Sequence, residues 1–381
     1  MAEWESEMTP GMAEEEPVMA EEERTPSLPV AEEREVEPTF SGEAMPEAAA
    51  EEPYAANEGA QTALTNETLR DWVQRWHFNG RKCLPDISTW NTSQVTDMSG
   101  LFKVQINRET KKPYACQEKF NEDISSWDKS NVTTMHGMFQ GAKSFNRPIG
   151  NWNVEKVTDM AAMFLFASKF NQPIGGWKVH NVTDMSLMFN WASAFNQPIG
   201  DWNVEKVTSM RLMFDQAWKF NQPIGDWRVD NVRNMHKVFQ AARSFNQPLN
   251  KWNVSNVTNM SNMFVEAKSF NQPLNDWRVD NVTNMGNMFN GASSFNQDLS
   301  NWRVDNVTNM HEMFRGASSF NQNIGSWRVD NVTKMERMFQ GAHSFSFGWC
   351  IRKDCKTDDM FTLSALPETK DKLPQPCCTI S

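Results

Sequence analysis

The chain has 381 residues, with 37 Lys or Arg against 48 Asp or Glu, and a formal net charge of −11. No run of eighteen apolar residues occurs in it, so we expect no segment that spans a membrane as a helix. Its six Cys lie outside the repeated part of the sequence and form no disulfide framework, so we expect a reducing compartment.

Residues 1–60 form an acidic segment. They contain eighteen Glu and no Asp against two basic residues, Arg24 and Arg34, so the rest of the chain carries a net charge of about +5. Such a composition buries too little apolar surface to fold alone, and we expect a disordered tail. The tail either keeps the protein soluble or lies over a basic face of the body. The first residues lack the positive charge and apolar run of a signal peptide.

Residues 61–82 predict an N-terminal capping helix. Thr65 is a candidate N-cap, and Leu69, Trp72 and Trp76 follow at helical spacing on one apolar face. A helix with one apolar face needs a surface to cover, and the repeats that follow supply it.

Residues 83–345 are dominated by a repeat with a strict period of 25 residues. Its unit approximates F-N-Q-P-I-G-D-W-x-V-x-N-V-T-N-M-x-x-M-F-x-G-A-x-S, and its first Phe recurs from Phe120 to Phe320. A partial unit precedes these copies, from Trp90 to Phe102, and an insertion near 104–116 separates it from them. Such a period indicates coils that cannot fold singly and are stable only when stacked.

Each unit predicts one short strand and one short helix. Between Val257 and Ala267 the apolar residues fall at i, i+3, i+6, i+7 and i+10, which is the spacing of one helical face. The segment 270–277 is too short and too rich in Pro for a second helix, and predicts a short extended stretch. We therefore expect an α/β repeat solenoid of the leucine-rich-repeat type.

The unit resembles that of the BspA-like leucine-rich-repeat surface proteins. The shared features are the period, the Trp, the V-T-x-M segment and the M-F pair, and the resemblance runs from about Leu69 to Phe345. It implies a leucine-rich-repeat-like fold and non-enzymatic binding or adhesion, often at a bacterial surface. The sequence departs from the family in showing no signal peptide.

No constellation of catalytic residues is visible. The six His are scattered, and neither a phosphate-binding glycine loop nor a serine elbow occurs. We expect no enzymatic activity, no cofactor and no metal. Cys350 and Cys355 either pack as thiols, which we favour, or join a disulfide or a metal site with other partners.

Large aromatic residues replace small or polar ones at one edge of three units. They are Phe166, Trp191 and Trp218, of which the first two share one register and should lie on adjacent coils. We predict either a hot-spot patch for a partner or accommodation inside locally wider coils.

Four units carry an Arg two residues before an Asp. Stacking would align these residues as parallel charged columns, which form either a solvated face of weak ion pairs or a docking strip for an acidic partner, including the protein's own tail. Nucleic acid fits poorly, because the interleaved Asp residues cancel the positive charge. The arginines are Arg228, Arg278, Arg303 and Arg328.

The end of the sequence predicts a C-terminal cap over 346–365 and a flexible tail over 366–381. The tail ends in Cys-Thr-Ile-Ser, which fits a prenylation box with Cys378 as the acceptor. Because one lipid holds a membrane only reversibly, Cys377 would supply a second acylation site. We expect no other membrane contact.

These features favour a non-enzymatic protein-binding scaffold, acting as a monomer in the cytoplasm or tethered by lipid to the cytoplasmic face of a membrane. The alternative is an exported surface adhesin of the BspA-like type. Neither interpretation identifies the protein partner.

Overall fold

The computed structural model describes residues 62–78, 84–105 and 114–347, together with residues 358, 360 and 362. All of them belong to one unit of the chain, Pro53–Ser381. The expectations for the tail over 1–60, for Cys350 and Cys355, and for Cys377 and Cys378 lie outside the described residues.

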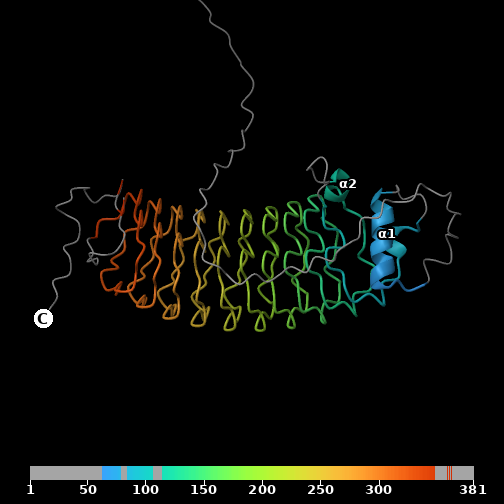
Figure 1. The fold of residues 1–381 in the computed structure, drawn as a ribbon, viewed down its shortest axis with the longest axis horizontal. Coiled ribbons are helices and arrows are strands. Elements are labelled where there is room, and N and C mark those ends of the chain that lie inside the picture. Colours follow the sequence, from blue (N-terminus) through green and yellow to red (C-terminus); the bar gives the residue numbers. More distant parts are fainter. Residues whose placement is uncertain are drawn as a thin grey trace, which may run out of the picture. The chain divides into compact units, whose positions relative to one another are not determined.

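The 25-residue units lie side by side as consecutive coils (Figure 1). One isolated parallel β-bridge joins each coil to the next at the third residue of the V-T-x-M segment, from the pair Asp97–Thr134 to the pair Asn309–Lys334. Each coil is therefore bonded to both neighbours at the same register, as the strict period requires.

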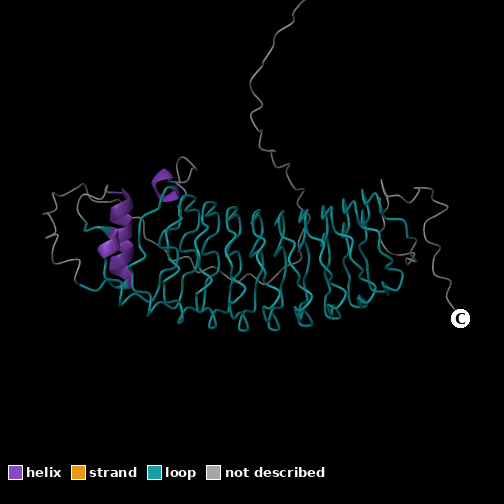
Figure 2. Ribbon diagram, turned by 180° about the vertical axis from the view of Figure 1, so that it is seen from behind, coloured by secondary structure: helices purple, strands orange, loops and turns teal. Residues whose placement is uncertain are grey.

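The short helix expected in each unit is absent from the described coils, which consist of turns and loops (Figure 2). In the coil 145–169 the segment forms two successive four-residue turns, the first closed by the Met163 N–H, which donates to the Met160 carbonyl at 3.2 Å. The third residues of the two turns, Ala162 and Phe166, have φ of 55° and 59°. A left-handed residue every four positions is incompatible with an α-helix.

Hydrogen bonds between coils explain why turns replace the helix. The N–H groups of Gly137 and Phe139 donate to the carbonyls of Ala161 and Met163 in the next coil, at 2.8 and 2.9 Å. In an α-helix the same N–H groups would instead donate to carbonyls four residues earlier in their own coil. Both arrangements turn the same apolar positions inward, so periodicity alone could not distinguish them.

The extended stretch expected over 270–277 forms no strand in the described structure. A column of asparagines bonds it to the preceding coil, as where the Asn271 N–H donates to Asn246 Oδ1 at 2.9 Å. Each Trp adds a second link, and Trp277 Nε1 donates to the Leu249 carbonyl at 2.9 Å. Side chains thus supply the bonds between coils here, where Pro residues remove backbone donors.

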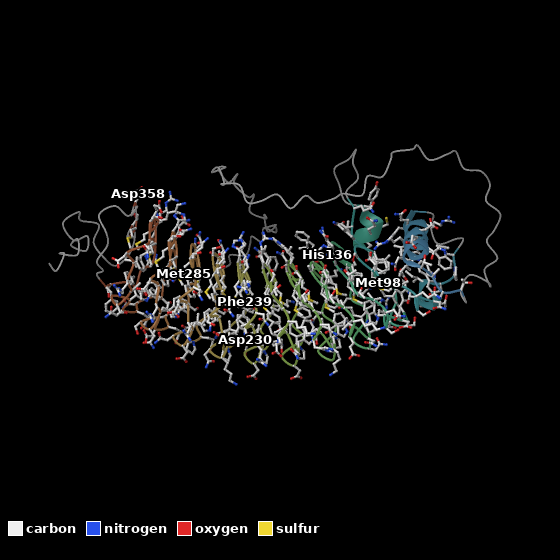
Figure 3. The ribbon with its side chains drawn as sticks, turned by 60° about the horizontal axis from the view of Figure 1, so that its bottom comes forward. Met98, His136, Asp230, Phe239, Met285 and Asp358 are labelled. Carbon is white, nitrogen blue, oxygen red and sulfur yellow. The ribbon has the colours of Figure 1, made fainter. Side chains whose placement is uncertain are left out.

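Columns of stacked rings fill the interior of the described array. Phe164 and Phe189 stack with their centroids 5.7 Å apart, and Trp177 and Trp202 stack at 6.4 Å. Figure 3 shows Phe239 within the stack and Asp230 at its edge. The columns run from coil to coil, so each coil buries the rings of its neighbours.

Helix α1, Asn66–Phe78, lies within 61–82, where the sequence predicts a capping helix. Thr65 Oγ1 accepts from the Thr68 N–H at 3.3 Å, as an N-cap does, and the ring of Trp72 lies 5.1 Å from that of Trp90 in the first coil. Helix α1 therefore covers the first coil. The other helical elements among the described residues are the 3₁₀ turn η1, Ile87–Thr89, and α2, Ala115–Glu118, which begins at the end of the insertion.

Residues 358, 360 and 362 continue the turn ladder at the opposite end. The N–H groups of Arg337 and Phe339 donate to the carbonyls of Asp358 and Met360, each at 2.9 Å. Met360 is buried. These residues therefore cover the last complete coil, within the segment 346–365 where the sequence predicts a cap.

Candidate partner-binding surfaces

Phe166, Trp191 and Trp218 form one exposed cluster, which we call the aromatic surface. Their exposed fractions are 43%, 40% and 38%, the largest among the large apolar residues that the structure describes. The ring centroids of Phe166 and Trp191 are 6.2 Å apart, and those of Trp191 and Trp218 are 5.9 Å apart. The three rings thus lie on consecutive coils and face outward, rather than being accommodated inside wider coils.

Two of these aromatic residues are held in a strained backbone conformation. Phe166 and Trp191 have φ of 59° and 57°, at the turn position where four other described coils have Gly. A left-handed conformation costs a residue with a side chain about 1–2 kcal/mol. Burial does not offset this cost, because both rings are exposed. Gln216, Ala241 and Glu266 adopt the same conformation at this position, so the strain belongs to the turn, and the exposure of the rings is what distinguishes Phe166 and Trp191. The corresponding glycines are Gly141, Gly291, Gly316 and Gly341.

A buried polar pair adjoins the aromatic surface. Asn190 and Asp215 are 3% and 5% exposed, and Asn190 Nδ2 donates to Asp215 Oδ2 at 3.2 Å. The Trp191 N–H donates to the Asp215 carbonyl at 2.8 Å, which places the pair next to the exposed rings. In the described structure Asp215 Oδ1 has no hydrogen-bond partner. Burial raises the pKa of the Asp215 carboxyl to about 6.

We expect Asp215→Asn to stabilise the protein by about 3 kcal/mol at pH 8, because a pKa raised by roughly two units means that the charged carboxylate is disfavoured by this order of energy. Between pH 3.8 and about 6 the folded wild type binds more protons than the unfolded chain, so its stability falls as pH rises. The gain from the substitution should therefore vanish near pH 4.

Urea unfolding at pH 4 and pH 8 measures this difference. Asp201→Asn, at an exposed carboxyl of the same coil, is the control and should change little at either pH. An equal effect of Asp215→Asn at both pH values would contradict a raised pKa of the Asp215 carboxyl.

The arginine columns are internally paired. Arg228 Nη1 lies 3.1 Å from Glu205 Oε1 on the preceding coil, and Arg303 Nε lies 3.5 Å from Asp280 Oδ1. These side chains are mostly exposed, and such pairs contribute about 0–1 kcal/mol each. Arg278 pairs with Asp280 at 3.7 Å and Arg328 with Asp305 at 3.6 Å.

This pairing favours a solvated face of weak ion pairs, because each arginine already has a carboxylate neighbour. It leaves little uncompensated positive charge for an acidic partner. The sequence prediction of a docking strip along these columns thus gains no support from the geometry.

The sequence interpretation missed Lys129, which is 2% exposed. It occupies a position where the eight following units carry Val, and this departure from the repeat was the available signal. Its Nζ donates to the Ile124 carbonyl at 3.0 Å and lies 4.0 Å from the centroid of the Trp152 ring. Burial lowers the pKa of the Lys129 ammonium well below its usual value.

Lys129 also interrupts a regular column of hydrogen bonds. In the seven following coils the Trp Nε1 donates to the carbonyl 28 residues earlier, as Trp177 does to Ile149 at 3.0 Å. The equivalent acceptor for Trp152 is the Ile124 carbonyl, which Lys129 occupies, and Trp152 Nε1 has no partner in the described structure. The buried lysine therefore leaves an unsatisfied donor beside it.

The described residues contain no group of three or more His, Cys, Asp or Glu side chains placed to hold a metal ion. The longest helix among them, α1, has 13 residues, so none of these helices could span a bilayer. Cys116 is exposed and free.

A family model described as "Mycoplasma protein of unknown function, DUF285" matches the chain three times, over residues 108–217, 195–285 and 273–370. These matches cover most of the repeats. No curated protein matches the chain.

Proposed function

The chain belongs to the DUF285 family of repeat proteins, and on this premise we propose that it is a non-enzymatic scaffold that binds a protein partner through the aromatic surface. One observation carries the proposal: Phe166, Trp191 and Trp218 expose three neighbouring large rings on consecutive coils. Exposed aromatic clusters of this kind anchor protein partners, because they bury a large area at a small cost in side-chain entropy.

Within this proposal the stack is a leucine-rich-repeat-like solenoid related to the BspA-like proteins. It acts as a monomer in the cytoplasm, without a cofactor, and a lipid on Cys378 and Cys377 would tether it to a membrane. Regular coils support the proposal, because they hold side chains of successive units at fixed spacing.

An exported surface adhesin is the second candidate, and the family resemblance favours it. Export through a glycosylating pathway would expose several N-x-T sites, among them those at Asn131, Asn181 and Asn281. In the folded array the side-chain amide of each of these three donates to a carbonyl of the preceding coil, as Asn181 Nδ2 does to Glu155 at 2.8 Å. A glycan on any of them would have to be attached before folding, and its detection would establish the adhesin.

We expect Trp191→Ala to abolish or strongly weaken capture of the partner in a pull-down from the native host, because truncation removes the central ring of the aromatic surface. Arg303→Ala is the control on the arginine columns and should leave capture unchanged. The reverse result would move the binding site to the charged columns, and equal capture by both variants and wild type would refute a role for the aromatic surface.

Fractionation of the tagged protein with and without Cys378→Ser tests the tether. Release from membranes on substitution is the expected result, because the variant cannot accept a prenyl group. A membrane-bound variant would contradict the lipid anchor.

A further inference from the structure

We propose that the aromatic surface and three adjacent cations bind an acidic peptide segment of the partner that also carries large apolar side chains. The inference rests on the proposed function and deepens it by naming the chemistry of the partner. The cations are Lys169, Lys219 and Arg243.

The three cations lie beside the exposed rings. Lys169 follows Phe166 by three residues, and Lys219 directly follows Trp218. The Arg243 guanidinium lies 5.4 Å from the centroid of the Trp218 ring. All three are exposed, and among the described residues none has a carboxylate within ion-pairing distance.

Cations at the same edge of the flanking coils are neutralised. Lys143 Nζ lies 2.8 Å from Glu118 Oε1, and Lys268 Nζ lies 3.3 Å from Glu266 Oε2. Lys143 and Lys169 share this edge, because the Lys169 N–H donates to the Lys143 carbonyl at 3.2 Å, and Lys268 repeats the position of Arg243 one 25-residue unit later. Uncompensated positive charge at this edge therefore coincides with the exposed rings, and a partner with negative charge would complement both.

The spacing of the rings fits an extended peptide. Their centroids are 6.2 and 5.9 Å apart along the direction in which the coils stack. Alternate side chains of an extended chain point to the same side at intervals of about 6.7 Å. A peptide lying along the stack could thus place alternate apolar side chains on consecutive rings, with its carboxylates near the lysines.

The arrangement of the rings is less suited to nucleic acid. Single-stranded nucleic acids stack their bases on free aromatic faces. Here Arg243 lies over the Trp218 ring, and the Trp191 and Trp218 rings meet at 62°, edge to face.

Fluorescence anisotropy on the full chain tests the proposal, with the labelled peptide Glu-Glu-Trp-Glu-Phe-Glu-Glu as the probe. A peptide in which Lys replaces every Glu should not bind. Trp191→Gly should weaken binding at least about tenfold, since hot-spot aromatics carry most of the energy of such contacts. Its melting temperature should not fall, because Gly occupies this turn position in other coils.

The double variant Lys169→Glu with Lys219→Glu should also weaken peptide binding about tenfold or more at low salt, with less effect at high salt. Lys178→Glu is the matched control, because Lys178 is an exposed cation on the coil that carries Trp191, at a different edge from the aromatic surface. It should stay within about twofold of wild type.

Unchanged peptide affinity in Trp191→Gly or in the double lysine variant would overturn the proposal. So would Trp191-dependent binding of a labelled twelve-residue deoxythymidine oligonucleotide in place of the peptide. If the acidic peptide does not bind but Trp191→Ala still loses the partner in the pull-down, this inference fails while the proposed function stands.

Discussion

Phe214→Ala should lower the free energy of unfolding by about 3–5 kcal/mol, the range measured for truncation of a fully buried Phe. Phe214 has no exposed surface, and its ring centroid lies 4.0 Å from that of Phe220. It also stacks at 5.7 Å on Phe189 and on Phe239, in the coils on either side. One cavity therefore weakens two interfaces between coils.

Equilibrium unfolding in urea, followed by Trp fluorescence, measures this loss. Because neighbouring coils stabilise one another, a weakened central coil should also broaden the transition or divide it in two. Trp218→Ala, at an exposed ring of the same coil, is the control and should cost less than about 1 kcal/mol. A cost below that level for Phe214→Ala would show that the phenylalanine columns do not hold the stack together.

Lys129→Val should raise the free energy of unfolding by about 1–4 kcal/mol at pH 7, because a buried ammonium loses its hydration on folding and a valine side chain carries no such cost. Valine fills the equivalent position in the eight following units, and its introduction frees the Ile124 carbonyl to accept from Trp152 Nε1. The substitution thus removes a buried cation and satisfies a buried donor.

The pH dependence gives this prediction its sharpest test. The Lys129 pKa in the folded protein lies below its usual 10.5, so between the two values the unfolded chain binds more protons. Wild-type stability therefore rises with pH in this window, and the advantage of the valine variant shrinks as pH approaches 10.5. Lys178→Val, at an exposed lysine, should show neither effect. A loss of stability in Lys129→Val at pH 7 would mean that the lysine's hydrogen bonds outweigh its burial.

The sequence could predict only part of the aromatic surface. The shared register of Phe166 and Trp191 already placed these residues on adjacent coils, and the structure brings their rings to 6.2 Å. Exposure could not be predicted, because a bulky residue at a turn fits either a wide coil or an outward position. The unpaired state of Lys169 and Lys219 was equally hidden, since ion pairs form between residues of different coils.

The sequence by itself determined the period, the inward-facing residues and the direction of stacking. Every 25 residues the same apolar side chains recur, and a unit too small to fold alone must bury them against its copies. This argument holds for any backbone conformation that turns those residues inward.

Only the tertiary structure decided which conformation that is. A helix and a pair of four-residue turns bury the same positions, and they differ in where the backbone N–H groups donate. Stacking offers carbonyls of the next coil at 2.8–2.9 Å, as for Gly137 and Phe139, and these bonds exist only once two coils are side by side. The unit therefore forms turns rather than a helix, because its neighbours satisfy its backbone groups.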